Sequence, residues 1–112
     1  MKEITDELMM QMISQAKLYS IVLLKSGPNY GKPENQPIIW EHARRNFALR
    51  EEGLLSVVCP VSDDTDLKGI GIFNAALEQT KEIMEGDPGV IAGVFNFEVH
   101  TARSFPGDSL PK

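Results

Sequence analysis

Apolar positions along the chain follow two different periods, and the order of these periods predicts the fold. Near the amino terminus, Ile4, Leu8, Met12 and Ala16 recur every fourth residue, as on the apolar stripe of an amphipathic helix. The next apolar stretch, 18–25, is almost continuous and rich in β-forming residues, which is typical of a buried strand. The same criteria predict helices at 3–16, 38–52 and 75–85, and strands at 18–25, 54–61, 68–74 and 94–101.

Turn-forming residues separate these predicted elements. Proline, glycine and asparagine fill 26–37, which we expect to be a loop, and Gly53 follows the second helix as its stop. The acidic turn 62–66 joins two strands as an antiparallel hairpin, and 86–89 breaks the third helix. After the first helix the order is β-α-β-β-α-β, so we predict an α+β fold of the ferredoxin-like, split βαβ type.

This fold places two helices on one face of a four-stranded sheet and leaves the other face uncovered. We divide the chain into an N-terminal helical extension at 1–17, a ferredoxin-like domain at 18–104 and an irregular tail at 105–112. In the last strand, Phe95 and Phe97 lie on one side, with Val99, and predict an apolar open face. A partner usually buries an apolar surface of this size, so we expect a homodimer.

Composition excludes several classes of function. The 112 residues suffice for one domain, and 11 basic against 16 acidic residues give a net charge of −5. That balance argues against nucleic-acid and acidic-membrane partners. The early acids do not fit a signal peptide, and no apolar run approaches the roughly 20 residues of a membrane span. We therefore expect a cytoplasmic protein.

Metal and redox chemistry find no support in the sequence. Cys59 is the single cysteine, it lies in an apolar run, and we expect it to be buried and inert. No Cys/His cluster has zinc spacing, and the aspartates Asp63, Asp64 and Asp66 are typical of a solvated turn. We predict no metal and no cofactor.

The second predicted helix, 38–52, carries the candidate chemistry. His42, Asn46 and Arg50 follow one another at four-residue spacing within its apolar arc, whereas Arg45 falls on the solvent face. A polar line through an apolar surface is typical of a pocket wall, and histidine can take and return a proton near neutral pH. The alternative is a boundary feature, with each polar group satisfied locally.

Asp87 is the candidate partner of His42. Pro88 holds Asp87 in extended backbone at the break after the third helix, and the two helices of this fold lie side by side. The two side chains can therefore approach each other, although an aspartate before proline also serves as a turn or capping residue. His100 lies opposite the apolar side of the last strand and is either a surface residue or a second pocket residue.

Several short pieces occur in a definite order and spacing. Residues 19–25 precede Gly27-Pro28, and His42 lies early on a helix that ends at 51–55. Residues 57–60 precede Asp63-Asp64 and 67–70, and residues 87–93 precede 97–100. Together these pieces resemble the YCII-related (YciI-like) family over most of the chain. The resemblance implies a ferredoxin-like fold that dimerises through its sheets, the dimeric α+β barrel. It also implies an active-site dyad of a helical histidine and the aspartate of an Asp-Pro pair, here His42 and Asp87.

The resemblance has departures. Cys59-Pro60 stands where the family usually has Gly-Pro, which changes one pocket wall and makes Pro60 a candidate contact of the substrate. Gly89 replaces a larger residue, and the N-terminal helix is an addition to the family pattern. Related proteins include a dehalogenating, lactone-processing enzyme, and muconolactone isomerases share the wider barrel fold.

Two hypotheses follow for the function. In the first, His42 is a general acid/base oriented by Asp87, while Asn46 or Arg50 positions an oxygen of a small organic acid or lactone for isomerase, lyase or hydrolase chemistry. In the second, the protein is a non-catalytic module that binds a small ligand or only dimerises.

Overall fold

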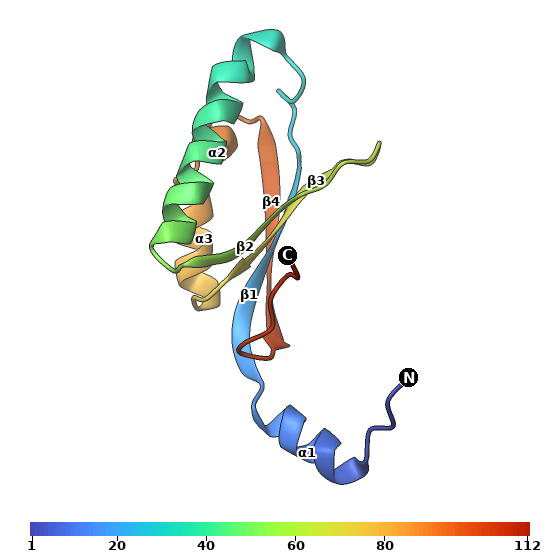
Figure 1. Cartoon of the computed structure of the whole chain (residues 1–112). Coiled ribbons are helices and arrows are strands. Elements are labelled where there is room, and N and C mark those ends of the chain that lie inside the picture. The colour runs from blue at the N-terminus through green and yellow to red at the C-terminus, as the bar shows by residue number, and fades with distance from the viewer.

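The elements of the structure follow the periods of the sequence closely. The structure is a computed structural model that describes residues 1–112 (Figure 1). Its elements are α1 (Asp6–Ser14), β1 (Lys17–Ser26), the short 3-10 helix η1 (Pro33–Asn35), α2 (Gln36–Glu51), β2 (Leu55–Pro60), β3 (Leu67–Phe73), α3 (Leu77–Glu85), α4 (Pro88–Ile91) and β4 (Phe95–Ser104).

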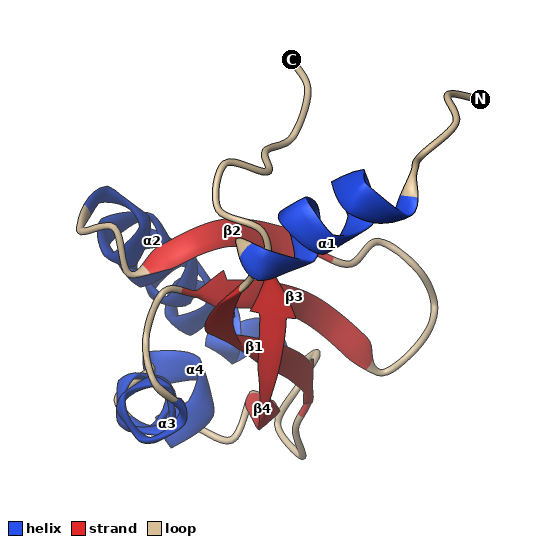
Figure 2. Cartoon of the chain, turned by 90° about the horizontal axis from the view of Figure 1, so that it is seen from below, coloured by secondary structure: helices blue, strands red, loops and turns tan.

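All strand pairs are antiparallel, and the strand order is β2-β3-β1-β4. Helices α2, α3 and α4 lie on one side of this sheet (Figure 2). This arrangement is the ferredoxin-like fold with one additional helix in front, which confirms the predicted fold class. The segment 86–89 was predicted only to end the third helix, but its second half also begins α4. Pro88 suits the first helical position, and Asp87 caps the helix.

Strand alternation and register decide which residues face the helices. Ser20, Val22 and Leu24 of β1 are buried under the helices, and the register places Val99 opposite Val22 and Phe97 opposite Leu24. The apolar side of β4 therefore faces the helices. The expectation that these residues form the open face was wrong, because alternation defines two faces without saying which one the helices cover.

The open face is nevertheless apolar, although β4 does not supply its apolar side chains. Its apolar residues come from the three other strands, in paired rows of half-buried side chains: Ile21 and Leu23 of β1, Ile70 and Ile72 of β3 and Val57 of β2. Cys59 also lies on this face and is exposed, because β2 is an edge strand, so the prediction of a buried thiol was wrong.

Helix α1 extends beyond the end of β1, away from α2 and α3 (Figure 1). Thr5 caps it by accepting from the backbone N–H of Leu8, and two acids in the first turn favour the helix dipole. None of its residues is buried, and Met12 and Ile13 are about half exposed. A helix of this length is marginal in water on its own. Its apolar stripe thus lacks a packing partner within the single chain.

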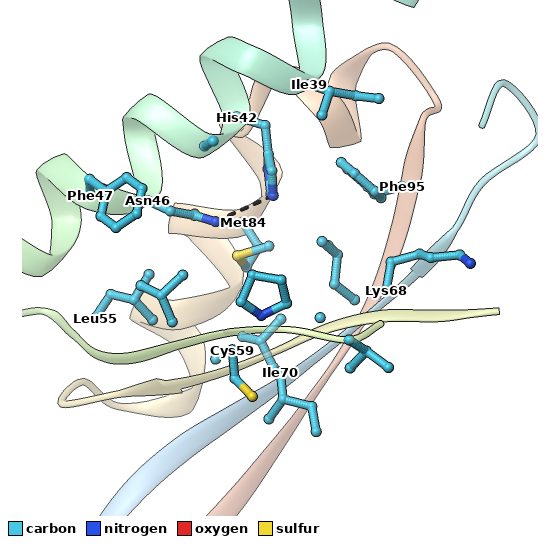
Figure 3. Close-up of a pocket in the computed structure, with 18 of the residues that line it drawn as sticks. Ile39, His42, Asn46, Phe47, Leu55, Cys59, Lys68, Ile70, Met84 and Phe95 are labelled. Carbon is cyan, nitrogen blue, oxygen red and sulfur yellow. Dashed lines mark hydrogen bonds between the residues drawn. The ribbon is translucent and has the colours of Figure 1, made fainter. Parts of the chain in front are cut away.

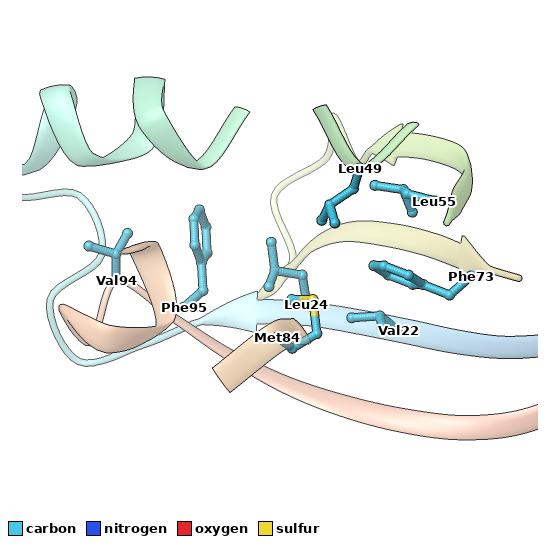
Figure 4. Packing of buried hydrophobic residues seen from close by; sticks show 8 residues of the cluster. All are labelled: Val22, Leu24, Leu49, Leu55, Phe73, Met84, Val94 and Phe95. Carbon is cyan, nitrogen blue, oxygen red and sulfur yellow. The ribbon is translucent and has the colours of Figure 1, made fainter. Parts of the chain in front are cut away.

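The hydrophobic core fills the space between the sheet and the helices. Its members come from α2, α3, all four strands and the turn before β4 (Figure 4): Val22, Leu24, Leu49, Leu55, Phe73, Met84, Val94 and Phe95. Trp40 of α2 is 68% exposed and takes no part in this core. The core is small, and α2 contributes Leu49 to it, while Ile38 and Ile39 of its first turn pack against it.

Candidate functional site

A cavity of about 300 Å³ lies between α2 and the sheet (Figure 3). Twenty residues line it, and 14 of them are hydrophobic, so the interior is largely apolar. This size is at the lower end of the range for small-molecule sites. The cavity borders the hydrophobic core and shares Phe73, Met84 and Phe95 with it.

The cavity borders β3, which carries glycine at two positions that face the helices. Gly69 and Gly71 alternate with Ile70 and Ile72, whose side chains point to the open face. A Cβ atom built at Gly69 would contact Leu24 at 3.7 Å, an ordinary packing distance. The backbone therefore leaves room for a side chain at this position, and the missing side chain leaves open space.

The imidazole of His42 and the carboxylate of Asp87 meet at one wall of the cavity. His42 Nδ1 is 2.8 Å from both carboxylate oxygens, and the two residues are 8% and 0% exposed. An ionised carboxylate can only accept a hydrogen bond, so Nδ1 carries the proton and donates it. The other ring nitrogen, Nε2, then has a free lone pair.

Local backbone structure fixes the carboxylate of Asp87. As the N-cap of α4, it accepts from the backbone N–H groups of Gly89 at 2.9 Å and Val90 at 3.2 Å. Gly89 is required here, because a Cβ atom would lie 2.6 Å from the ring of Phe95 and 3.0 Å from Asp87 Oδ2. The departure from the family pattern at this position therefore has a steric reason.

Arg45 is a neighbour of the pair that the sequence placed on the solvent face. Its Nη1 atom is buried without a hydrogen-bond partner and lies 3.9 Å from Asp87 Oδ1. The positive charge adds to the donors around the carboxylate, and its three-residue spacing from His42 is the signal that could have identified it.

Asn46 lies beside His42, as predicted. Its Nδ2 is 3.3 Å from His42 Nε2, and the contact is drawn as the dashed line in Figure 3. Pro60 also lines the cavity. The roles of Asn46 and Pro60 toward a ligand stay predictions.

Arg50 and His100 lie outside this cavity. Each four-residue step along an α-helix adds about 40° of rotation, so Arg50 is turned about 80° from His42 and is exposed. His100 pairs with Ile21 and therefore lies on the open face, where its Nε2 is 3.6 Å from Glu98 Oε2. The four-residue spacing was correct for Asn46, but the accumulated rotation separates Arg50 from the site.

Two cavity residues had no signal in the sequence. Tyr30 comes from the loop after β1, and Lys68 comes from the start of β3. Lys68 Nζ lies 4.9 Å from the centroid of the Tyr30 ring and donates to the carbonyl oxygen of Thr65 at 2.7 Å. Their proximity depends on how a loop packs against a strand, which no periodic pattern encodes.

Two carboxyl groups outside the cavity have perturbed acidity. The hydrogen bond from Lys25, followed by the contact with His100, lowers the pKa of Glu98 on the open face. In the acidic turn, hydrogen bonds from Thr65 lower the pKa of Asp63. The aspartates of this turn are exposed, and no three His, Cys, Asp or Glu side chains are grouped to hold a metal ion.

Comparisons with known proteins do not establish a family for the chain. No protein-family model matches it, and no curated protein matches it. It is similar to the solved structure of 5-chloro-2-hydroxyhydroquinone dehydrochlorinase from Burkholderia phenoliruptrix AC1100, in complex with 2,5-dihydroxybenzoquinone. That similarity has 22% identity and a TM-score of 0.48, and covers 75% of this chain and 91% of the other. At this level, the function of the chain has to be argued from its own geometry, and the YCII-related resemblance stays a prediction.

The chain contains no helix long and apolar enough to cross a membrane. A cytoplasmic location stays a prediction.

Proposed function

We propose that the protein is a small-molecule enzyme in which His42 is the general acid/base and Asp87 orients it. The observation that carries this proposal is the contact of 2.8 Å between two buried ionisable side chains at the wall of an apolar cavity. A histidine within hydrogen-bond reach of a carboxylate beside a cavity is the arrangement that general acid/base catalysis requires. The proposal is based on the geometry of this site, because proteins that share one fold have many unrelated functions.

The tautomer of the imidazole determines what the pair can do. With its Nδ1 proton donated to Asp87, His42 takes a proton from the substrate at Nε2, and the carboxylate stabilises the imidazolium ion that forms. Return of this proton to another atom of the substrate gives isomerisation. Its return to a leaving group of the same substrate gives elimination. In hydrolysis His42 instead takes the proton from an attacking water molecule and passes it to the leaving group, so we propose isomerase, lyase or hydrolase chemistry on a small organic acid or lactone.

Asn46 and Pro60 complete this site. The Asn46 amide lies 3.3 Å from Nε2, which is close enough to donate to that nitrogen or to a substrate oxygen beside it. Pro60 has no backbone N–H and contributes an apolar wall. Arg50, which is exposed, has no place in this mechanism.

Proton exchange in D2O tests the catalytic role. Wild type should catalyse deuterium incorporation next to the carbonyl group of levulinate or γ-butyrolactone, followed by proton NMR. General acid/base catalysis contributes about 10²–10⁴-fold, and a loss of this size is expected for His42→Gln. The chain has two histidines, so His100→Gln on the open face is the matched control and should leave the rate unchanged. Exchange that survives His42→Gln would contradict the role.

The second candidate function is a non-catalytic ligand-binding module, and the largely apolar lining of the cavity favours it. Nitrogen-15 NMR of the imidazole separates the two candidates. The enzyme requires the Nδ1–H tautomer, and Asp87→Asn should reverse it, because an amide N–H would then face Nδ1. Ligand binding in wild type and in His42→Gln alike, with no exchange in either, would favour the module.

We further propose that two copies of the chain pair through their open sheet faces. The rows of half-buried apolar side chains on this face support the pairing, as does the lack of a packing partner for α1. Ultracentrifugation should show a dimer for wild type and a monomer for Ile72→Glu, which places a charge in the middle of the face. Gln79→Glu, on exposed α3 surface, is the control and should remain dimeric.

A further inference from the structure

We infer that the cavity selects a small monoanion, whose apolar, ring-sized body fills the space beside His42 and whose negative group is held by Lys68. This inference rests on the proposed function, since it names the class of substrate for the same site. A cavity of about 150 Å³ holds benzene, so about 300 Å³ suits one ring with a single polar substituent. Larger substrates exceed the available space.

The charges of the lining select the sign of the ligand. None of the lining residues is an aspartate, a glutamate or an arginine, and Lys68 is the one permanently charged side chain among them. Asp87 does not line the cavity, because the His42 ring stands in front of its carboxylate. A cationic ligand would lose water without meeting a counter-charge, whereas a single negative group finds the ammonium of Lys68.

A β-bulge brings Lys68 to this cavity. Leu24 pairs with Gly69 and Lys25 pairs with Leu67, so Lys68 is the extra residue without a partner on β1. Bulges change the direction of a side chain, and regular alternation would have directed this one to the open face with Ile70. The bulge instead brings the ammonium over the Tyr30 ring, on the side that the helices cover.

The ammonium group of Lys68 has capacity for a ligand. It carries three N–H donors, and the structure assigns one of them to the carbonyl oxygen of Thr65. No carboxylate lies within ion-pair distance of it, although its charge contributes to the lowered pKa of Asp63; Lys25 and Lys81, in contrast, contact Glu98 and Glu78 directly. In Figure 3, Lys68 lies at the Phe95 end of the cavity and Phe47 at the opposite end. The flexible stem allows the head group to move toward a ligand.

The test compares three ring-sized probes that differ mainly in charge: benzoate, benzamide and benzylamine. Dissociation constants come from proton–nitrogen NMR titration of the full chain at low ionic strength. We expect benzoate to bind about fivefold more tightly than benzamide, the effect of a partly exposed ion pair, and benzylamine to bind more weakly than both. Equal or tighter binding of benzamide, or no binding of benzoate, would overturn the inference.

Variants locate the effect. Lys68→Met should remove the preference for benzoate over benzamide, Lys68→Arg should keep it, and Lys32→Met, which removes an exposed ammonium outside the cavity lining, should leave it unchanged. A preference that survives Lys68→Met would overturn the inference, provided that the NMR spectrum shows the native fold. The experiment needs no turnover, so its outcome is independent of whether His42 exchanges protons.

Discussion

Removal of the Asp87 carboxylate is the perturbation that the structure predicts most fully. Asp87→Ala removes the N-cap of α4, which costs about 1 kcal/mol. It also removes the charge-assisted hydrogen bond from His42 Nδ1, worth about 1.5–3 kcal/mol. Together these losses lower the free energy of unfolding by about 3 kcal/mol, and at about 4 °C per kcal/mol for a domain of this size they lower Tm by about 12 °C.

Asp87→Asn separates the two contributions. Asparagine is as good an N-cap as aspartate, so its oxygen keeps the backbone N–H groups of Gly89 and Val90 satisfied. The charge is lost, and we expect this variant to lose about half as much as Asp87→Ala, about 1.5 kcal/mol. Proton exchange should nevertheless fall as far as in His42→Gln, because the tautomer is reversed.

The assay is urea denaturation followed by far-ultraviolet circular dichroism at one fixed protein concentration, since a dimer makes apparent stability depend on concentration. Asp64→Ala in the exposed acidic turn is the control and should stay within about 0.5 kcal/mol of wild type. A loss below about 1 kcal/mol for Asp87→Ala, or equal losses for the alanine and asparagine variants, would refute this account of the pair.

Three further substitutions test the cavity, helix α4 and the open face. Gly69→Val should fill the cavity and abolish benzoate binding in the NMR titration while the His42 tautomer is kept; undiminished binding would show that the ligand site is elsewhere. Gly89→Ala should cost about 1–3 kcal/mol in urea denaturation through overlap with the Phe95 ring, and wild-type stability would contradict the steric argument. The pKa of Glu98 is lowered in the folded state, chiefly by the Lys25 hydrogen bond, so this carboxylate stabilises the fold above its ordinary pKa and the contribution disappears as the pH falls through the lowered value. Lys25→Met should raise the pKa of Glu98 in a carbon-13 NMR titration, and an unchanged value would contradict that cause.

The secondary structure and topology were predictable because each long element carries its own period. The almost continuous apolar run of β1 and the four-residue spacing of α1 are local signals, and the order of elements restricts the topology to one common arrangement. Helix α4 was missed because four residues are too few to show a helical period. Its start was still encoded, in the Asp87-Pro88 pair that was interpreted as a break.

The candidate site was predictable only where a local signal in the sequence marks its residues. His42 and Asn46 share a face of α2, and Asp87 followed from the break that precedes β4. Lys68 depends on the register between β1 and β3, which is a property of pairing between distant segments. The same limit explains the error about β4, since Phe97 faces the helices only because its partner Leu24 does.

The burial of Asp87 argues for more than a structural role. A helix cap needs one side-chain oxygen, and Thr5 supplies it for α1 with an uncharged hydroxyl. A carboxylate at 0% exposure costs far more to desolvate than a hydroxyl, and a cap alone does not offset this cost. Asp87 uses Oδ2 for the cap and both oxygens for His42, while Arg45 stands nearby at 3.9 Å. The charge is therefore explained by the imidazole that it orients toward the cavity, which is the property that an acid/base site requires and a turn does not.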